Sequence, residues 1–508
     1  MAIFRQKSAL FAVPLLAALS ANGALAQNSL LPFLADDLKA GERLFTRDHA
    51  PGSQGLGYDI SARRIQNDGS WTSVKKGASG AKNENFLIYG KPFYAMADGE
   101  VEACWRNAPD NPVPGDHHPD KKAGLIAGGG NMLLVRESGG VITLYAHARP
   151  GSIPASLCPH DARLFSEPGK TSEMDIPVGS RPKIKAGQLL GRVGNSGRSS
   201  GPHLHVHKVK DGKAHPITFA RGLATPWNAA MADINKWTRF AGRSIPKGEV
   251  LIWPPRRLSQ EYARHRFNPN AYSRLFDHLV DSGFKPGWFD GYSVGSKAFY
   301  NFVWRPADRL FRAWRDLSSV TYQQRINAAI ADGFEPTHVE SYLVNGQVRH
   351  ALIVEKGVPG SFLARHGLTS AQHQRVFDQA RAQSLNPVNI SVVSVNGQRR
   401  YTVLYRSNNI GSWVVKSRVP VRDYQALFNA QKASGRLPRY VGAYMHDGTA
   451  HFSVVFASSL DGAVALHGLT PSGYQAAFTE QTGAGRVTRV VSGYDGAEVN
   501  HRFVGVWK

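Results

Sequence analysis

The pattern of apolar and polar positions repeats itself along the C-terminal half of the chain. In one unit, apolar residues recur at helical spacing over 322–330, and Gly333 follows as a helix stop. Residues 337–344 then alternate as a strand, Asn345-Gly346 is typical of a hairpin turn, and residues 349–354 return as a second strand. This pattern predicts a helix followed by a two-stranded hairpin.

Equivalent positions of this unit recur every 50 or 51 residues. One series holds aromatic residues or histidine, namely Tyr272, Tyr322, His373, Tyr424 and Tyr474. Self-similarity of this kind is typical of tandem arrays in which each unit shares its core with its neighbours. We therefore predict five α-β-β repeats over residues 269–508, with the recurrent aromatic residues in the core; the alternative is a sugar- or peptide-binding stripe.

The N-terminal residues 1–26 have the pattern of a secretory signal peptide. Arg5 and Lys7 give a basic start, residues 8–21 are mostly apolar, and Ala24-Leu25-Ala26 has the small residues of a cleavage site. The apolar run is too short to span a membrane comfortably. The sequence therefore predicts an exported protein, periplasmic or extracellular, with no membrane span.

Length and charge narrow the expected partners. The 508 residues suffice for about two to four domains. The 61 Lys and Arg outnumber the 38 Asp and Glu, and a formal net charge of +23 attracts polyanions over long distances. For an exported protein we expect cell-wall peptides or anionic envelope polymers as partners. Nucleic acid is not expected, because no nucleic-acid-binding motif is present. The charge could also serve solubility alone.

The strongest chemical signal is His203-Leu204-His205. Side chains alternate along a strand, so both imidazoles point to the same face. One ring could hold a metal while the other contacts a polarised water or the substrate. The motif follows glycine turns over 187–197 and a Ser-Ser-Gly-Pro segment, and Tyr145-Ala146-His147 lies on another predicted strand.

Together these segments resemble the M23 family of zinc peptidases, the lysostaphin and LytM group that cleaves cell-wall peptides. The resemblance covers about residues 83–220 and includes residues 90–101 as the opening hairpin. It implies a mainly antiparallel β domain over residues 27–222. It further implies His205 as a zinc ligand, with His147 and His203 as catalytic residues that orient water and stabilise the oxyanion.

The other two zinc ligands of that family come from a His-x-Gly-x-Asp segment just before the opening hairpin. This chain has Ala81-Lys82-Asn83-Glu84-Asn85 there, which offers only Glu84 as a metal ligand. Other candidates are His117, His118, His49 and Asp59. Because tight zinc binding needs three protein ligands, this departure predicts weak or absent zinc and little peptidase activity, with the groove kept as a binding site.

Export also gives a meaning to the two cysteines, Cys104 and Cys158. Both lie in the M23-like segment, and an exported protein folds in an oxidising compartment. We predict a disulfide between them, with two buried thiols as the alternative.

The C-terminal units resemble the bacterial tandem repeats found beside the serine-hydrolase domains of polyglycine hydrolases. The cues are Gly333-Phe334-Glu335-Pro336 and Arg365-His366-Gly367-Leu368-Thr369, the latter echoed at 466–470. The resemblance implies a binding or positioning array without chemistry of its own. Residues 223–268, which contain Pro254-Pro255, are predicted to form a connector.

The sequence thus predicts a multidomain α+β protein in which an M23-like domain precedes five repeats. Its expected function is to bind, and possibly hydrolyse, peptidoglycan or glycine-containing peptides. Two alternatives stay open: a catalytically inactive regulator of another hydrolase, and a binding protein in which the repeats do the work.

Overall fold

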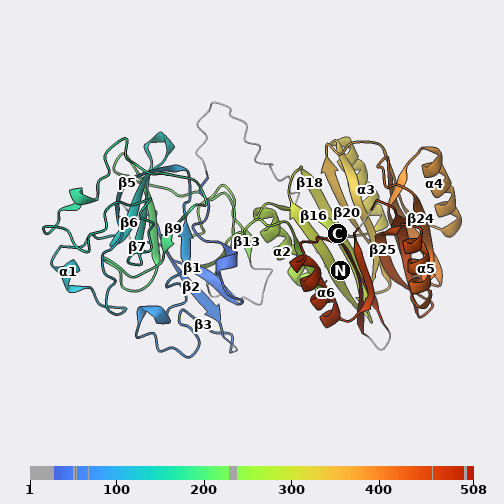
Figure 1. Ribbon diagram of the computed structural model, residues 1–508, viewed down its shortest axis with the longest axis horizontal. Helices are drawn as coiled ribbons and strands as arrows, with labels where there is room; N and C mark the ends of the chain where they lie inside the picture. Colours follow the sequence, from blue (N-terminus) through green and yellow to red (C-terminus); the bar gives the residue numbers. More distant parts are fainter. Residues whose placement is uncertain are drawn as a thin grey trace, which may run out of the picture. The chain divides into compact units, whose positions relative to one another are not determined.

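The computed structural model describes residues 28–49, 52, 54–66, 68–227, 237–459, 462–496 and 500–508. These form two compact units (Figure 1). The front domain comprises residues up to 257 together with 274–282, and the repeat domain comprises 258–273 and 283–508. The predicted signal peptide lies outside the described residues. Within the described ranges, no helix is both long and apolar enough to cross a membrane.

The front domain is built on one large sheet whose strand pairings are all antiparallel. The strand order is β13-β12-β14-β1-β2-β10-β7-β6-β5-β8, with β3 added to β2 and β11 added to β10. The strands are β1 (Glu42–Thr46), β2 (Tyr58–Ile65), β3 (Trp71–Thr72), β5 (Gly99–Trp105), β6 (Asn131–Arg136), β7 (Ile142–Ala148), β8 (Lys183–Ile184), β10 (Leu204–Lys210), β11 (Lys213–His215), β12 (Leu223–Pro226), β13 (Thr238–Arg239) and β14 (Val250–Trp253).

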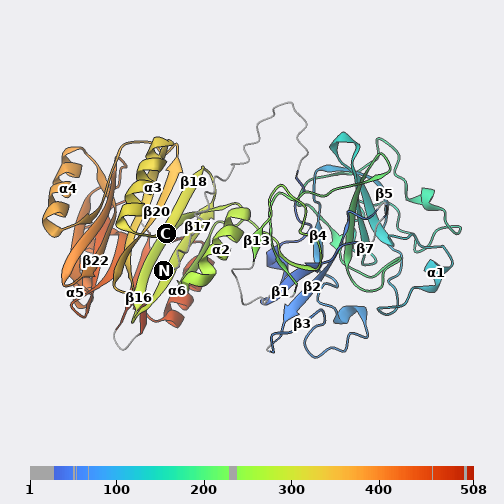
Figure 2. The same ribbon diagram turned by 180° about the vertical axis from the view of Figure 1, so that it is seen from behind.

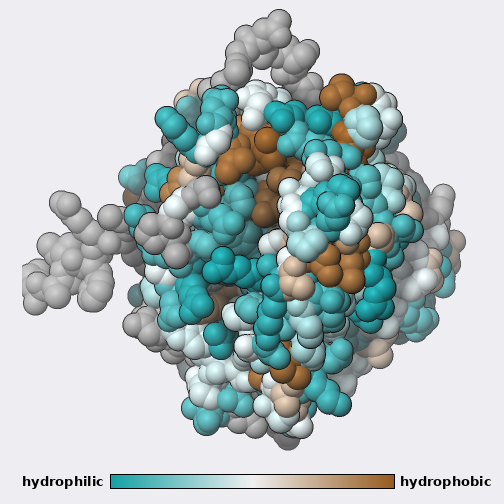
Figure 3. Space-filling view, turned by 90° about the vertical axis from the view of Figure 1, so that its left-hand side faces the viewer, coloured by the Kyte–Doolittle hydropathy of each residue, from teal (hydrophilic) through white to brown (hydrophobic). Residues whose placement is uncertain are grey.

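Smaller elements complete this domain. They are the strand pair β4 (Pro92–Tyr94) and β9 (Leu189–Arg192), the short helix α1 (Pro119–Lys122), and the 3-10 turns η1 (Ala35–Asp37), η2 (Asn83–Asn85), η3 (Ser138–Gly140) and η4 (Thr171–Met174). Hydrophilic residues dominate the face that lies to the left in Figure 1, with smaller hydrophobic patches between them (Figure 3).

One face of the central strands is buried in the core of the front domain, so functional side chains can lie only on the other face. Leu204 and Val206 on β10 have no exposed surface and pack with Ile60 of β2 and Tyr145 of β7. The Tyr145 hydroxyl accepts a hydrogen bond of 2.7 Å from the Met96 backbone N–H, so its polar atom is satisfied in the core. Because side chains alternate, the odd-numbered residues of β10 point away from this core.

Residues 223–253, predicted to belong to a connector, instead supply three strands of the front sheet. β14 pairs with β1, with Ile252 opposite Leu44, and β12 pairs with β14. The apolar run Val250-Leu251-Ile252 explains the pairing, because it is buried only when it lies in a sheet.

The predicted disulfide is confirmed. Cys104 on β5 is bonded to Cys158 in the loop after β7, and their Cα atoms lie 5.7 Å apart. Both residues are fully buried in the core. The bond therefore ties an edge region of the sheet to a segment that has no strand of its own.

Removing this disulfide should destabilise the front domain. The sequence separation is 54 residues, and the loop-entropy argument gives roughly 4 kcal/mol for a closed loop of about this size. We expect the Cys104→Ala/Cys158→Ala double variant to unfold at lower denaturant concentration than the oxidised wild type. Reduced and oxidised wild type with the same denaturation midpoint would contradict this expectation.

The repeat domain contains five three-stranded sheets, each with one helix. In each repeat a strand precedes the helix and pairs with the last strand of the hairpin, so the unit is β-α-β-β. The α-β-β unit predicted from the sequence therefore lacked its first strand. In the second repeat this strand, Phe311–Leu317, is an edge strand with mostly half-buried residues and charged side chains, so it lacks the alternation that reveals a strand.

The repeats are bounded as follows: β15 (Tyr262–Phe267), α2 (Pro269–Asp281), β16 (Phe284–Val294) and β17 (Lys297–Pro306); β18 (Phe311–Leu317), α3 (Ser319–Ala331), β19 (Phe334–Val344) and β20 (Gln347–Lys356); β21 (Phe362–Leu368), α4 (Ser370–Ala382), β22 (Asn386–Val395) and β23 (Gln398–Arg406); β24 (Trp413–Pro420), α5 (Val421–Ala433), β25 (Leu437–His446) and β26 (Thr449–Ala457); β27 (Val464–Leu469), α6 (Pro471–Gly483), β28 (Thr488–Asp495) and β29 (His501–Trp507).

These repeats close into a ring. We call the second of the three strands of each repeat, in chain order, its middle strand; these strands are β16, β19, β22, β25 and β28. Each middle strand lies beside that of the next repeat, and β28 returns to lie beside β16. Helices α3 to α6 lie around the outside of these strands (Figure 2). The closing contact joins the first repeat to the last, where the Ser492 hydroxyl donates to Asp290 Oδ1 at 2.6 Å and the Gly493 N–H donates to Asp290 Oδ2 at 3.0 Å.

Within the part of the chain that the structure describes, neighbouring middle strands are not paired through backbone hydrogen bonds. Side-chain hydrogen bonds join them instead. The Ser341 N–H donates to the Ser391 hydroxyl at 3.0 Å, and the Ala443 N–H donates to the Ser492 hydroxyl at the same distance. Asp290, which takes the place of Ser391 and Ser492 in the first repeat, accepts in the same way from the Gly493 N–H. Buried backbone groups need such partners, which explains why polar residues occupy the centre of the ring.

Two carboxyl groups share this centre, and both have raised pKa values. Burial raises the pKa of Asp290 to about 7. Burial and the nearby Asp290 charge raise the pKa of Glu340 well above its ordinary value. The folded ring therefore binds protons more tightly than the unfolded chain does.

The stability of the ring should consequently fall as the pH rises from about 4 to about 7, because tighter proton binding stabilises the folded state only while the protons stay bound. An effect on the order of a few kcal/mol is expected from a shift of this size. Denaturant midpoints of the intact chain measure it, with Asp290→Asn as the comparison. A variant whose midpoint depends on pH as steeply as that of the wild type would contradict this origin.

Candidate metal centre

Strand β10 presents histidines on the face opposite the core. His203 immediately precedes the strand, His205 and His207 lie on it, and Leu204 and Val206 between them point inward. β10 is central in the sheet, so both neighbours contribute to this face. The strand register places His205 opposite Asp59 on β2 and opposite Ala146 on β7.

Three possible metal ligands meet here: His49, Asp59 and His205. Their nitrogen and oxygen ligand atoms all lie within 4.8 Å of one another. His205 Nδ1 lies 2.7 Å from Asp59 Oδ1, and His49 Nε2 lies 3.9 Å from Asp59 Oδ2. Two imidazoles and a carboxylate form a donor set of the kind that catalytic zinc uses. The chemistry of these residues therefore fits zinc.

This finding revises the ligand set expected from the sequence. The histidine and aspartate that are absent before the opening hairpin have counterparts farther upstream, on either side of the β1–β2 connection. Asp59 reaches His205 because β2 pairs with β10, and His49 follows β1 in the same sheet. That pairing joins residues 146 positions apart, so local sequence around residue 83 held no sign of it.

His147 and His203 stand at the rim of the three-residue group. Their ring centroids are 4.7 Å apart, and the ring of His147 is 6.1 Å from that of His205. His203 Nε2 lies 3.3 Å from Asp59 Oδ1. The structure thus brings together His147, His203 and His205, and it places His49 and Asp59, two of the further candidates from the sequence, beside them.

Backbone carbonyls orient both rim histidines. His147 Nδ1 lies 2.8 Å from the Ser196 carbonyl oxygen, and His203 Nδ1 lies 2.8 Å from the Gly201 carbonyl oxygen. A carbonyl can only accept, so each Nδ1 carries a proton, which leaves Nε2 of His147 as the acceptor in its neutral ring, whereas Nε2 of His203 faces the Asp59 carboxylate. His147 also has a positive φ of 68°, a conformation that is costly outside glycine and that clusters at functional sites.

The electrostatics of the group favour neutral imidazoles at His147 and His207 and an ionised carboxylate at Asp59. Burial, together with the charges of His203 and His205, lowers the pKa of His147 well below its ordinary value. Burial would raise the pKa of Asp59, but hydrogen bonds from His203 and His205 outweigh it and hold that pKa below its usual range. Burial also lowers the pKa of His207 to about 4. Neutral imidazoles and carboxylates are the forms that bind metal.

Glu84 lies outside this group. Its side chain is exposed on η2, and its carbonyl oxygen accepts a hydrogen bond of 2.6 Å from Lys75 Nζ. The neighbouring Asn83 is buried and accepts from Asn195 Nδ2 at 2.8 Å. Residues 83–85 therefore support the loop that leads to His203 rather than the metal centre.

His117 and His118 are likewise in a supporting loop. His118 Nδ1 accepts from the Asp120 N–H and caps α1, while its own N–H donates to Asn111 Oδ1 at 2.9 Å. Asn111 Nδ2 in turn donates to the carbonyl oxygens of Gly197 and Ser199. This loop thus buttresses the segment that precedes His203.

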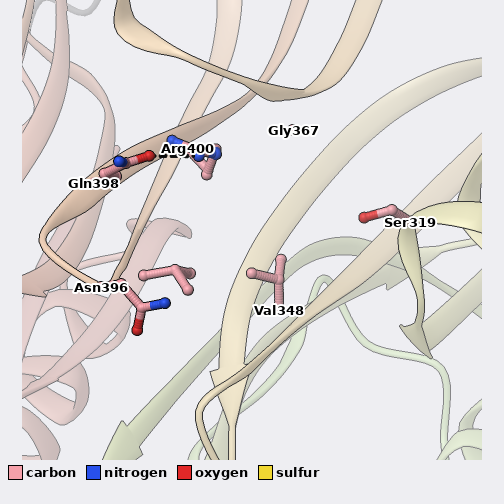
Figure 4. Close-up of a pocket in the computed structure, with 7 residues that line it drawn as sticks. Ser319, Val348, Gly367, Asn396, Gln398 and Arg400 are labelled. Carbon is pink, nitrogen blue, oxygen red and sulfur yellow. Dashed lines mark hydrogen bonds between the residues drawn. The ribbon is translucent and has the colours of Figure 1, made fainter.

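The repeat domain offers separate cavities. One of about 220 Å³ is lined by all five middle strands, including Tyr292, Tyr342 and Tyr494. Another, of about 340 Å³, lies between the second and third repeats (Figure 4). There Ser319 and Val348 face Gln398 and Arg400, which are joined by a hydrogen bond of 2.7 Å. Neither cavity contains an arrangement of side chains that resembles the histidine group.

Comparisons with known proteins agree with the two resemblances expected from the sequence. The C-terminal half matches, five times, the family model described as a polyglycine hydrolase-like structural repeat, at residues 259–307, 309–357, 359–408, 411–459 and 461–508. A stretch of 104 residues is 31% identical to the DD-carboxypeptidase/endopeptidase Mpg of Neisseria meningitidis serogroup B, and equally to that of Neisseria gonorrhoeae. This stretch is 20% of the chain and 18% of those relatives.

Among solved structures, about a third of the chain matches peptidase structures. The lysostaphin catalytic domain of Staphylococcus simulans is 19% identical, with 36% of this chain and 90% of that chain covered and a TM-score of 0.18. A zinc-containing peptidase of Vibrio cholerae is 16% identical over 32% of this chain and 48% of its own, with a TM-score of 0.15.

Proposed function

We propose that this chain is an exported zinc-dependent peptidase that cleaves peptide bonds in peptidoglycan or in glycine-containing peptides. The observation that carries the proposal is the convergence of His49, Asp59 and His205, with His147 and His203 at the rim. The partial relatives named for carboxypeptidase and endopeptidase activity support the reaction class. The net charge of +23 suits a substrate embedded in an anionic envelope.

In this proposal His49, Asp59 and His205 hold zinc. When bound, zinc supplies a Lewis acid that polarises water and the substrate carbonyl. His147 has its Nδ1 proton committed to the Ser196 carbonyl, so its Nε2 atom is available to the reaction, while Nε2 of His203 lies beside Asp59. One Nε2 can take the proton of the attacking water, and a ring protonated in that way can then donate to the oxygen that gains charge. Both roles need neutral rings at the start, which burial provides for His147.

The zinc proposal is tested by metal content. The purified chain should hold about one zinc, and Asp59→Asn should lose it, because an amide oxygen is a poor zinc ligand beside carboxylate. His49→Ala and His205→Ala should behave in the same way. Glu84→Gln is the matched control and should keep its zinc, since Glu84 is exposed outside the group. Elemental analysis after dialysis gives the answer, and zinc loss from Glu84→Gln but not from Asp59→Asn would refute this ligand set.

Substitution of His147 or His203 should lower catalysis without removing the metal. His147→Ala and His203→Ala should retain zinc but lower kcat/KM for release of peptides from purified peptidoglycan by roughly 10²-fold or more, the usual contribution of a general acid or base. His117→Ala, which removes a histidine from the supporting loop, serves as the comparison. Full activity in both rim variants would show that these histidines are not catalytic.

The principal rival is a catalytically inactive protein that binds wall peptides or regulates another hydrolase. The same assays separate the two, because an inactive regulator would release no peptide even when the wild type is loaded with zinc. The cavities between the repeats favour a binding role for the repeat domain in either case.

A further inference from the structure

A fifth histidine, His207, contacts the candidate metal centre on the side of His205 that faces away from Asp59. Its Nδ1 lies 2.8 Å from Nε2 of His205, while Nδ1 of His205 lies 2.7 Å from Asp59 Oδ1. His205 is buried, with 4% of its surface exposed. Both ring nitrogens of this proposed ligand therefore have a defined partner inside the protein.

The position of His207 is fixed by the strands on both sides of β10. It lies opposite Leu144 on β7. On the β2 side, a Cβ at Gly57 would lie 2.7 Å from the His207 Cβ and 2.7 Å from the Val206 carbonyl oxygen. Gly57 thus leaves the space that this histidine occupies. The imidazole is held in place by packing, so its Nδ1 points at His205.

The proton positions follow from the chemistry of the neutral imidazole, which has one N–H and one lone pair. If His205 Nδ1 offers its lone pair beside Asp59 and His49, its proton must be on Nε2. A buried N–H without an acceptor is costly, and His207 Nδ1 is the atom placed to accept it. Ligand histidines commonly have such an acceptor on the second nitrogen, which sets the tautomer and the ring orientation.

In the metal-free protein, the His205 and His207 rings can both still make hydrogen bonds, with the proton of each ring on its other nitrogen. His205 Nδ1 then donates to Asp59, and His207 Nδ1 donates to His205 Nε2. A leucine in place of His207 could do neither. An asparagine could do both by rotating its amide, because its oxygen accepts and its nitrogen donates.

We infer that His207 is a positioning residue that keeps the His205 proton on Nε2 and thereby leaves Nδ1 free to bind the metal. This inference rests on the proposed zinc function. It concerns a residue outside the ligand set and outside the reacting groups, so it can fail while that function stands.

The test compares the zinc affinity of wild type, His207→Asn and His207→Leu, measured by competition with a chromophoric chelator. His207→Leu should bind zinc about 10- to 100-fold more weakly, the usual effect of losing such a partner. His207→Asn should remain within a few-fold of wild type. Circular dichroism and thermal unfolding of the metal-free proteins check that the variants are folded.

A second measurement needs no variant. Nitrogen NMR of the histidine-labelled, zinc-loaded wild type should show a proton on His205 Nε2 and none on its Nδ1. The opposite assignment would overturn the inference, as would equal zinc affinity of wild type and His207→Leu, or an Asn variant as weak as the Leu variant. A wild-type chain that binds no zinc would instead remove the proposed function, and this inference with it.

Discussion

The candidate site depends on one alignment, the antiparallel pairing that sets His205 opposite Asp59. A slip of one residue between β2 and β10 would turn Asp59 to the core face and place Ile60 among the histidines. The buried residues that alternate with these polar ones prevent such a slip, because it would expose Ile60 or, if β10 moved instead, Leu204 and Val206. Hydrophobic burial on one face of β10 thus determines the chemistry on the other.

Loop carbonyls orient the rings of His147 and His203. His147, the second-last residue of β7, has a backbone conformation that few residues tolerate, and the Ser196 carbonyl fixes its ring. His203 is fixed by Gly201 in the segment that Asn111 buttresses. A rigid sheet therefore supplies two of the proposed ligands, whereas hydrogen-bonded loops set the orientation of the groups proposed for proton transfer.

Sequence reasoning found what is local. Short stretches of the sequence are enough to recognise His203-Leu204-His205 and Tyr145-Ala146-His147. The cysteine pair and the repeat period can also be read directly from the sequence. Sequence reasoning put Glu84 first among the missing ligands because the family spacing was sought there, and it named His49 and Asp59 only as further candidates, whereas the sheet brings these two beside His205 from far upstream. It also overlooked the first strand of each repeat, because half-exposed edge strands lack a clear alternation.

Closure of the repeat ring has a consequence for how this domain can vary. Open solenoids gain or lose units readily, since each unit contacts only its neighbours and the ends are capped. Here the Asp290 carboxylate of the first repeat accepts hydrogen bonds from one backbone N–H and one hydroxyl of the fifth, so no unit is terminal. A chain with four or six copies would need a different curvature to close. Duplication or deletion of a repeat should therefore be disfavoured, and sequence divergence among the five copies is the route left for specialisation.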